Sequence, residues 1–443
     1  MATGSGGLGA LTLDMADLRA NAPVIHGSVQ NIYRWHHDGR DYLVSEASDA
    51  GSAFDVGTFF EIPGSGQSRT ELRHAVFRRL ASAAAWQALT RADVDACCSG
   101  TVAERRWSDA RLQRLCAEGA ATHHVGVVDE ATGEVTDGAV RSRIVLVEAF
   151  PVIRPVHFTR LGRSAWDYHR YQIADRKLVD LEHIFRLGSP AGSSIEQRYR
   201  KAVQSGNAAA AEQLLRGLGL DKPIVAWGKF DDMLYDCSTK YEDHDRYLGW
   251  QEAVHVSGVD HDVFDTVIEL LAFCTIMVNR VFAELGFILW DMKWEAAVDG
   301  AEVVVVDTVD HDSIRITSDE LVDGRRCYTH FNKQAVRDYY RILHPEWVAA
   351  LDDAKARAEA DPTARTFMSV YEEGVALRQY PPIPPLDPDF AAIQTRKYDK
   401  VAGGASGRLP IDADGGIRAI VEDEVRYYAG RGRGDEFLSH ISA

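Results

Sequence analysis

The alternation of hydrophobic and polar positions predicts strands on both sides of a helix in the first part of the chain. Apolar and aromatic runs at 31–35 and 42–45 flank Asp38-Gly39, a pair typical of tight hairpin turns. Apolar residues recur at helical spacing over 70–89, and strand-like runs return over 123–158. This order favours an α+β fold with antiparallel sheets over a doubly wound fold.

The second part of the chain predicts a long helix followed by a hairpin. Residues 195–218 predict a helical hairpin or a single Ala-rich helix, and 262–285 predict a long helix that stops at Gly286. Two apolar runs, 287–298 and 302–309, follow and meet at Asp299-Gly300, which is a strong hairpin signal.

Four segments follow from these changes in pattern. Residues 1–21 predict a flexible, Gly-rich leader, and 22–158 an N-terminal antiparallel β domain with a helix. Residues 159–361 predict an α+β domain, and 362–443 a Pro- and Gly-rich C-terminal extension. In that extension a stiff, Pro-rich run precedes a Gly-rich stretch at 403–416 and a short final helix.

Composition narrows the range of partners. The 443 residues include 49 Lys and Arg against 66 Asp and Glu, a formal charge of −17. Binding to nucleic acid or to an anionic membrane draws on an excess of cations, so neither partner is expected. The six cysteines lack the paired spacing of a zinc site, which favours reduced thiols and a cytoplasmic location. The most apolar stretch, 264–290, contains several charged residues and predicts a core helix, not a membrane span.

The strand predicted at 287–298 carries the strongest chemical signal. Side chains alternate along a strand, so Asp291, Lys293 and Glu295 share one face. Carboxylate oxygens are good magnesium ligands and an ammonium group neutralises phosphate, so this face suits magnesium and a polyphosphate. The alternative is a solvated sheet face with surface ion pairs.

Whether Asp307 joins this face depends on the hairpin turn. A two-residue turn would put Asp307 on the face of Met292, opposite to Lys293. A three-residue loop with Gly300 in the left-handed conformation would set Asp307 opposite Asp291. We predict the three-residue loop, because only that register gathers all four charges on one surface. A two-residue turn with no compensating irregularity would separate them.

Other polar stretches carry weaker signals. The run 238–245 places Lys240 among acids, which is more often a solvated surface pair than a site. Gly-rich loops at 48–55 and 62–66 could bring backbone N–H groups to an anion, although such loops more often only turn the chain. None of these stretches alone assigns a function.

Taken together and in order, these stretches resemble the SAICAR synthetase family over most of residues 24–341. Enzymes of this family use ATP to join a ribotide carboxylate to the amine of aspartate. The family patterns D-x-K-x-E, D-E and P-D-S-x-R resemble 291–295, 307–308 and 311–315. The patterns T-K-x-E-x-H-D, S-D-R-x-S-A-F-D, I-P-G-K-G and D-K-Q-x-x-R-D resemble 239–245, 48–55, 62–66 and 332–338.

The resemblance implies an ATP-grasp-like two-domain fold, with ATP and Mg²⁺ bound between the domains and residues 159–361 as the nucleotide- and metal-binding part. Glu295 and Asp307 become metal ligands, and Lys293 a phosphate contact. Catalytic roles fall on Lys293, Lys240 and Asp291. The remaining implied contacts are Gly27, Ser28 and Val29 for the cofactor, and Ser52, Asp55, Ser164, Asp312 and Arg315 for the substrate.

The chain also departs from the family patterns. In the opening G-K-V-R-D-I-Y element, Ser28, Gln30 and Asn31 replace two cations and an acid. Ala50 stands where the S-D-R element has Arg, and Ser65 stands where I-P-G-K-G has Lys. Because an anionic ribotide and ATP both use such cations, a changed substrate or nucleotide geometry is expected.

We therefore expect an ATP-dependent ligase that forms an amide or related C–N bond through an acyl phosphate. Its substrates would be a carboxylated, purine-precursor-like heterocycle or nucleotide and an amine such as aspartate, in specialised, antibiotic-type nucleoside metabolism. The alternatives are a kinase-like phosphoryl-transfer enzyme on the same fold and a non-catalytic nucleotide-binding protein. A homo-oligomer is also allowed. Lys333, on a helix predicted at 332–341, is expected to lie outside the cleft.

Overall fold

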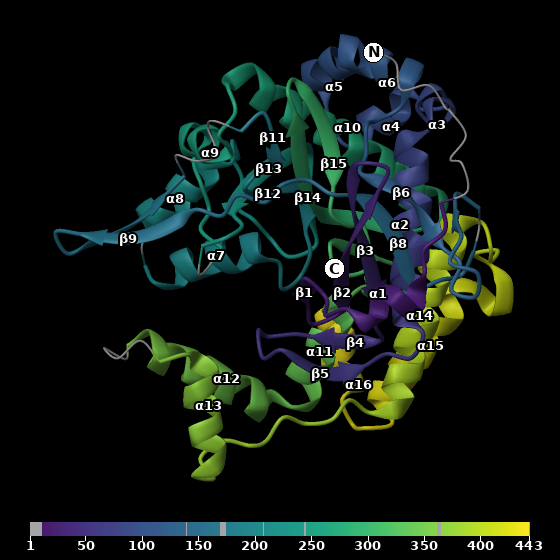
Figure 1. Ribbon diagram of the computed structural model, residues 1–443. Helices are drawn as coiled ribbons and strands as arrows, with labels where there is room; N and C mark the ends of the chain where they lie inside the picture. Colours follow the sequence, from purple (N-terminus) through teal and green to yellow (C-terminus); the bar gives the residue numbers. More distant parts are fainter. Residues whose placement is uncertain are drawn as a thin grey trace.

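The structure, a computed structural model, describes residues 11–138, 140–168, 174–206, 208–242, 245–360 and 365–442. Its N-terminal layer is a six-stranded sheet in the order β1-β2-β3-β8-β6-β7 (Figure 1). The strands are β1 (Ile25–His26), β2 (Gln30–His37), β3 (Arg40–Ala47), β6 (His124–Val128), β7 (Val135–Thr136) and β8 (Ile144–Glu148). Asp38 and Gly39 join β2 to β3 with positive φ angles, so the predicted antiparallel hairpin is confirmed.

The first described residues pack on this sheet. α1 (Met15–Ala20) begins after Asp14, whose carboxylate accepts two backbone N–H groups. Leu13 and Leu18 are buried in the same cluster as Tyr33 of β2. From residue 11 onward the predicted leader is therefore an ordered part of the N-terminal layer, because its leucines enter the core. Residues 1–10 lie outside the described residues.

Helix α2 (Ser65–Ala81) packs against β3, β6 and β8. The helix predicted at 70–89 is two helices, because Ser82 leaves the helical conformation and caps α3 (Ala83–Gln87). A small sheet of β4 (Ala50–Ser52) and β5 (Thr58–Glu61) precedes α2. The short helices α4 (Arg91–Asp95), α5 (Gly100–Trp107) and α6 (Ala110–Glu118) follow α3.

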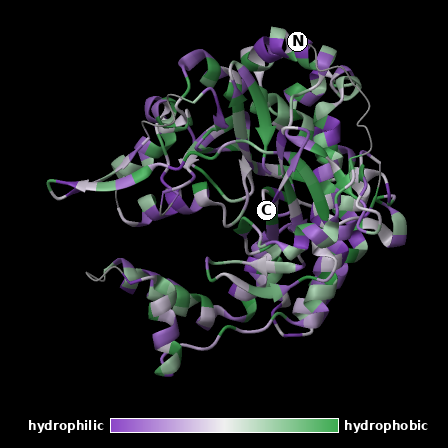
Figure 2. Ribbon diagram, viewed as in Figure 1, coloured by the Kyte–Doolittle hydropathy of each residue, from purple (hydrophilic) through white to green (hydrophobic). Residues whose placement is uncertain are grey.

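A second sheet forms the framework of the candidate site. Its order is β11-β14-β12-β13, with β15 and β16 also paired to β14. The strands are β11 (Arg176–Leu178), β12 (Leu181–Ser189), β13 (Gly228–Thr239), β14 (Ile288–Asp299), β15 (Glu302–Val306) and β16 (Ile314–Thr317). Figure 2 shows hydrophobic strands at the centre of the molecule, where α10 (His261–Glu284) packs against β14 and β15.

Helix α10 confirms the predicted core helix. Its composition and length would allow a membrane span, but 67% of its most apolar window is buried inside the protein. Gly286 follows it with a φ of 79°, as a C-terminal stop requires. α9 (Trp250–Ser257) precedes it, and the predicted helical hairpin is present as α7 (Ser194–Gln204) and α8 (Ala208–Gly217).

The hairpin of β14 and β15 corrects one prediction. Asp299 pairs with Glu302 and Val298 with Val303, so the turn consists of two residues, Gly300 and Ala301. The predicted three-residue loop is wrong. The turn lies one residue later than the Asp299-Gly300 signal suggested, because Gly300 takes its positive φ at the first turn position.

Two arms project from the same side of the molecule (Figure 1). One is the hairpin of β9 (Val156–Arg160) and β10 (Arg163–Asp167), which pair only with each other among the described strands. The other consists of α12 (Pro345–Glu359) and α13 (Phe367–Ala376), and it follows α11 (Gln334–Leu343). A third small sheet pairs β17 (Glu320–Val322) with β18 (Arg325–Cys327).

The C-terminal extension is a helical layer. α14 (Pro388–Ser406) packs along α2, and α15 (Gly416–Ala429) and α16 (Gly434–Ile441) follow (Figure 1). Phe390, Tyr398 and Tyr428 enter the main core. The Gly-rich stretch predicted at 403–416 is partly wrong, since α14 continues to Ser406. Gly403 allows close packing, because a Cβ at this residue would lie 2.8 Å from the Leu409 side chain.

Charged groups hold this layer in place, and we call them the C-terminal ion cluster: the buried Lys397, Glu424 and Asp338, and the partly exposed His440. Lys397 Nζ lies 2.5 Å from Oε2 of Glu424, with exposed fractions of 0% and 1%. The Lys397 ammonium also donates to the His330 carbonyl oxygen at 2.8 Å. His440 Nε2 lies 3.2 Å from Oδ1 of Asp338 on α11.

Candidate functional site

One face of β14 carries the charges that its alternation predicted. Glu295 is buried there and forms an ion pair with Lys240, which directly follows β13. Lys293 Nζ lies 2.5 Å from Oε1 of Glu182 on β12. The solvated-face alternative is therefore wrong, since these charges are paired and Glu295 is only 5% exposed.

Asp307 joins this face by leaving its strand. β15 ends at Val306, opposite Glu295, and Asp307 then takes a φ of 69° in the left-handed region. Asp adopts this conformation more readily than most residues. His123 Nε2 lies 3.1 Å from the Asp307 carbonyl oxygen and supports the bend. The left-handed residue compensates for the two-residue turn, so the acids converge although the predicted register is wrong.

We call Glu295 and Asp307 the acid pair. Burial raises the pKa of Glu295, and the Asp307 carboxylate raises it further, against the effect of Lys240. Burial would also raise the pKa of Asp307, but Lys240, a hydrogen bond from Glu295 and Arg73 outweigh burial and lower it. The two carboxylates thus raise each other's cost of carrying charge, and a divalent cation bound between them would relieve that repulsion.

Asp291 lies two residues before Lys293 and serves a neighbouring network. Arg186 on β12 and Arg315 on β16 are its direct cross-strand neighbours. Arg315 donates to the Asp291 carboxylate at 2.8 Å, and Arg186 lies 3.6 Å from it. Both arginines approach the same oxygen, Oδ2, of this buried carboxylate, so the structure places Asp291 as a support for two arginines.

The loop between β15 and β16 holds two further acids. The Asp310 carboxylate accepts the backbone N–H groups of Asp312 and Ser313 at 2.8 and 3.3 Å, which closes a tight turn. Asp312 Oδ2 lies 3.6 Å from Nε of Arg69, a buried residue of α2. The loop is thereby tied to the N-terminal layer.

Lys333 lies beside this loop, and its predicted place outside the cleft is wrong. Its backbone N–H donates to the His311 carbonyl, and its Nζ lies 3.5 Å from Oγ of Ser52 on β4. Burial lowers the pKa of Lys333, and Asp312 acts in the opposite direction. The helix α11 begins one residue later and is turned so that Lys333 faces the candidate site.

The loop of Gly27, Ser28 and Val29 lies next to Ser52. Ser28 Oγ is 3.3 Å from Ser52 Oγ, and the Val29 carbonyl accepts the N–H of Ser48. Gly27 donates its own N–H to the Gln30 carbonyl, so its backbone closes a tight turn. This loop is linked to Lys333 by Ser52, which contacts both Ser28 and Lys333. None of the three loop residues is a cation.

Two predicted substrate contacts lie away from the acid pair. Asp55 is exposed and forms an ion pair with Lys355 of α12 at 2.8 Å. Ser164 lies on the projecting β9–β10 hairpin, where its Oγ is 2.5 Å from Nε2 of His157. Residues 243 and 244 of the motif that contains Lys240 lie outside the described residues.

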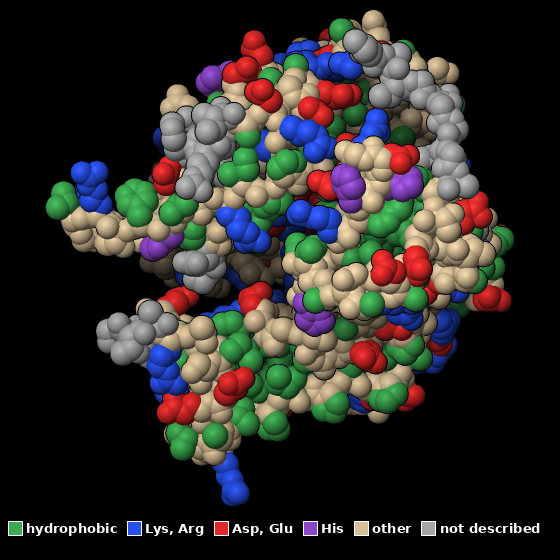
Figure 3. Space-filling view, viewed as in Figure 1, with side chains coloured by type: hydrophobic (Ala, Val, Ile, Leu, Met, Phe, Trp, Pro, Cys, Tyr) green, Lys and Arg blue, Asp and Glu red, His purple; other side chains and the backbone are tan. Residues whose placement is uncertain are grey.

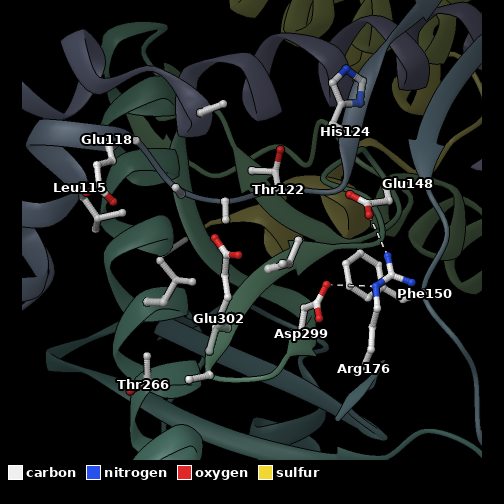
Figure 4. A pocket seen from close by; sticks show the side chains of 18 of the residues that line it. Leu115, Glu118, Thr122, His124, Glu148, Phe150, Arg176, Thr266, Asp299 and Glu302 are labelled. Atoms are coloured by element: carbon white, nitrogen blue, oxygen red, sulfur yellow. Dashed lines mark hydrogen bonds and ion pairs between the residues drawn. The ribbon is translucent and has the colours of Figure 1, made fainter. Parts of the chain in front are cut away.

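The surface is hollowed between the two arms, and Lys and Arg side chains gather near the inner end of the hollow (Figure 3). A separate cavity of about 860 Å³ opens beside the turn of the β14–β15 hairpin. Figure 4 shows Arg176 bridging Glu148 and Asp299 in its wall. None of the predicted site residues lines this cavity.

The acid pair fits a magnesium ion that arrives with a nucleotide. No group of three or more His, Cys, Asp or Glu suited to a metal exists among the described residues. Magnesium in phosphate-transfer sites is usually held by one or two carboxylates together with phosphate oxygens and water. Two hard carboxylates, of which Glu295 has a raised pKa, and the adjacent ammonium groups match that requirement.

Several residues of the site were not found from the sequence. Glu182 anchors Lys293, His123 supports Asp307, and Arg73 lowers the pKa of Asp307. They lie on β12, before β6 and on α2, far from the motifs in the chain. No local pattern marks them, because their role depends on which strands and helices become neighbours.

Comparison with known proteins shows the family of the chain. Residues 23–353 match the SAICAR synthetase family. A provisionally assigned phosphoribosylaminoimidazole-succinocarboxamide synthase of Archaeoglobus fulgidus is 30% identical over 245 residues, which are 53% of this chain and 64% of that protein. The aligned part thus spans just under two thirds of that relative.

Solved structures of SAICAR synthetases are also similar. The enzyme from Saccharomyces cerevisiae complexed with SAICAR is 18% identical and covers 90% of this chain and 97% of its own, with a TM-score of 0.49. A type-2 SAICAR synthetase in complex with ADP is 14% identical and covers 81% and 99%, with a TM-score of 0.40.

The fold and the site define an α+β protein with antiparallel sheets and a buried pair of carboxylates beside two lysines. The match over residues 23–353 makes the chain a member of the SAICAR synthetase family, a family of ATP-dependent C–N ligases. Its low identity to the compared relatives marks it as a divergent member.

Proposed function

We propose that the chain is an ATP-dependent ligase that activates a carboxylate as an acyl phosphate and passes it to an amine. The observation that carries this proposal is the convergence of Glu295 and Asp307 with Lys240 and Lys293 on one partly enclosed face. Membership of the family supports the same reaction class.

The chain's own residues contribute positioning and charge neutralisation. Glu295 and Asp307 would hold Mg²⁺, which lowers the repulsion between ATP phosphates and an approaching carboxylate. Lys240, once released from Glu295, and Lys293 would place ammonium groups beside the transferred phosphoryl. Glu182 keeps Lys293 oriented.

The carboxylate substrate is proposed to bind between Ser52, Lys333 and Arg315. Among the described residues, the Lys333 ammonium has no closer side-chain partner than Ser52 Oγ at 3.5 Å, and it is therefore proposed to bind the carboxylate. Arg315 presents its remaining donors beside Asp291. A carboxylated heterocycle or nucleotide and an amine such as aspartate match this charge pattern.

A substrate different from the ribotide of purine synthesis is also part of the proposal. Ser28, Gln30, Ala50 and Ser65 lack cations that the family patterns carry. A role in specialised nucleoside metabolism rests on these sequence differences alone.

The test is ADP release with defined substrates. The protein is incubated with Mg²⁺, ATP, candidate carboxylates and candidate amines, and ADP is measured for each combination. The proposal requires ADP release that depends on both partners. Release with the carboxylate or another acceptor alone, with a stable phosphorylated product, would indicate a kinase-like enzyme. Nucleotide binding without any ADP release would indicate a non-catalytic binding protein.

A further inference from the structure

The buried face of α2 is polar where it lies beneath the candidate site. Arg69 and Arg73 are one helical turn apart and only 4% and 7% exposed. Residues four apart share a helix face, so both guanidinium groups extend toward the same region. Proteins rarely bury arginine unless it is paired, so the partners of these two residues need to be identified.

Arg69 has defined partners. Its guanidinium donates to the carbonyl oxygens of Ser48 and Ala50 at 2.9 and 3.2 Å and lies 3.6 Å from the Asp312 carboxylate. Ala50 is the position where the family pattern has arginine. The Arg69 guanidinium therefore donates to the backbone of Ala50, the position where this chain has alanine instead of the arginine of the family pattern.

Arg73 is different, because among the described residues it forms no ion pair within 4.0 Å. Its closest polar neighbour is His123 Nε2 at 3.4 Å, and its Nε has no hydrogen-bond partner. When His123 donates its Nε2–H to the Asp307 carbonyl, that nitrogen offers Arg73 no acceptor. A buried guanidinium with so few partners is costly unless nearby negative charge offsets it.

The offsetting charges lie in the candidate site. Burial lowers the pKa of Arg73, and the two carboxylates that act against burial are Asp307 and Asp310. The charge of Arg73 in turn helps to lower the pKa of Asp307. His123 Nε2 lies 3.4 Å from the Arg73 guanidinium and 3.1 Å from the Asp307 carbonyl oxygen, so Arg73 lies one side chain away from Asp307, where a nucleotide polyphosphate would add further negative charge.

We propose that Arg73 is a positioning residue for a magnesium-bound polyphosphate: its charge compensates, from beneath the acid pair, for the cations absent at Ala50 and Ser65. Arg69 supports it by holding the Ser48–Ala50 backbone to Asp312. This inference rests on the proposed function, because it assumes that the acid pair receives a nucleotide.

The test compares Mg-ATP binding in the full-length chain and in three variants. Arg73→Met removes the charge and keeps much of the volume, and Arg73→Lys restores a charge. Arg78→Met is the matched control, since Arg78 lies on the same helix but pairs with Asp137 at the surface. Calorimetry with Mg-ATP gives the Kd, and thermal unfolding without ligand gives the Tm.

We expect Arg73→Met to weaken Mg-ATP binding roughly tenfold or more, with a Tm equal to or above that of the unchanged chain. Arg73→Lys should recover much of the affinity, and Arg78→Met should bind like the unchanged chain. Should Arg73→Met not fold, Arg73→Gln carries the same comparison.

Two results separate the possible failures. Equal Kd values in all proteins that fold, with a lower Tm for Arg73→Met, would overturn the role of Arg73 and leave the ligase proposal standing. Absence of Mg-ATP binding by the unchanged chain would overturn the proposed function and this inference together.

Discussion

Two clusters of buried charge are built from the same residue types in different ways. In the C-terminal ion cluster, Lys397 and Glu424 are 0% and 1% exposed, and the ammonium also reaches a carbonyl oxygen. At the candidate site, the side chains of Lys240 and Glu295 are 19% and 6% exposed, and that of Lys293 is 39% exposed. The Lys397–Glu424 pair is closed, whereas the candidate site opens to solvent at Lys293.

The difference in exposure indicates which charges stabilise the fold and which are able to bind a ligand. A closed pair that satisfies its own charges can only hold elements together, here α14 and α15. The open cluster has two carboxylates in competition for a proton and a nearby guanidinium without an ion pair. Charged side chains that lack full pairing within the protein are expected where a charged ligand binds and supplies the missing partner.

The largest expected effect comes from the acid pair. Glu295→Gln and Asp307→Asn each remove a carboxylate charge from the proposed metal site while keeping the side-chain shape. We expect turnover to fall by about a thousandfold or more in each, roughly 4 kcal/mol of transition-state stabilisation. Steady-state ADP release measures it. Glu302→Gln, at the exposed turn end of the same hairpin, is the control, and equal activity in all three variants would refute the assignment.

The closed cluster should show the opposite behaviour. Lys397→Met leaves Glu424 buried without its cation and is expected to lower the free energy of unfolding by about 3 kcal/mol. The double variant Lys397→Met/Glu424→Leu should regain most of that loss, because no charge stays buried. Urea unfolding measures both, and Mg-ATP affinity of the folded proteins should not change. A loss of affinity in the folded double variant would mean that this cluster also serves the site.

Lys333 tests how far the open cluster extends. Lys333→Met should raise the KM for the carboxylate substrate about tenfold, with a smaller change in kcat, because it removes one charge-assisted contact. Lys355→Met is the control, since Lys355 pairs with the exposed Asp55. An unchanged KM in Lys333→Met would place the carboxylate elsewhere.

The smallest effect concerns pH. Burial alone would lower the pKa of His440, but the Asp338 carboxylate outweighs burial and raises it. The ion pair therefore contributes stability below the ordinary histidine pKa of about 6.5, and this contribution is lost as pH rises through the raised value. We expect a decline of up to about 1 kcal/mol between neutral and alkaline pH. His440→Asn should remove that decline in unfolding curves recorded across this range, and an unchanged slope would contradict the pairing.

The sequence predicted the elements better than their junctions. Alternation alone placed Lys293 and Glu295 on one face, because the period of two is a property of any strand. The position of Asp307 could not follow from the hairpin alone. It depends on a left-handed residue supported by His123 from the other sheet, a contact that exists only after the two layers meet.

The remaining misses have the same origin. Lys333 faces the site because the loop before α11 turns back onto His311. Arg73 matters because His123, which precedes β6, lies between Arg73 and the Asp307 carbonyl. Neither relation leaves a local pattern. Asp55 and Ser164 show the converse: motif positions that match a family pattern can still lie on exposed parts of the chain.

A crystal structure of the chain with Mg²⁺ and a non-hydrolysable ATP analogue tests the central claim most directly. We predict that the metal is bound by carboxylate oxygens of Glu295 and Asp307, that Lys240 has moved from Glu295 toward phosphate, and that Lys293 contacts the triphosphate. A nucleotide bound elsewhere, with the Lys240–Glu295 pair intact, would contradict the account.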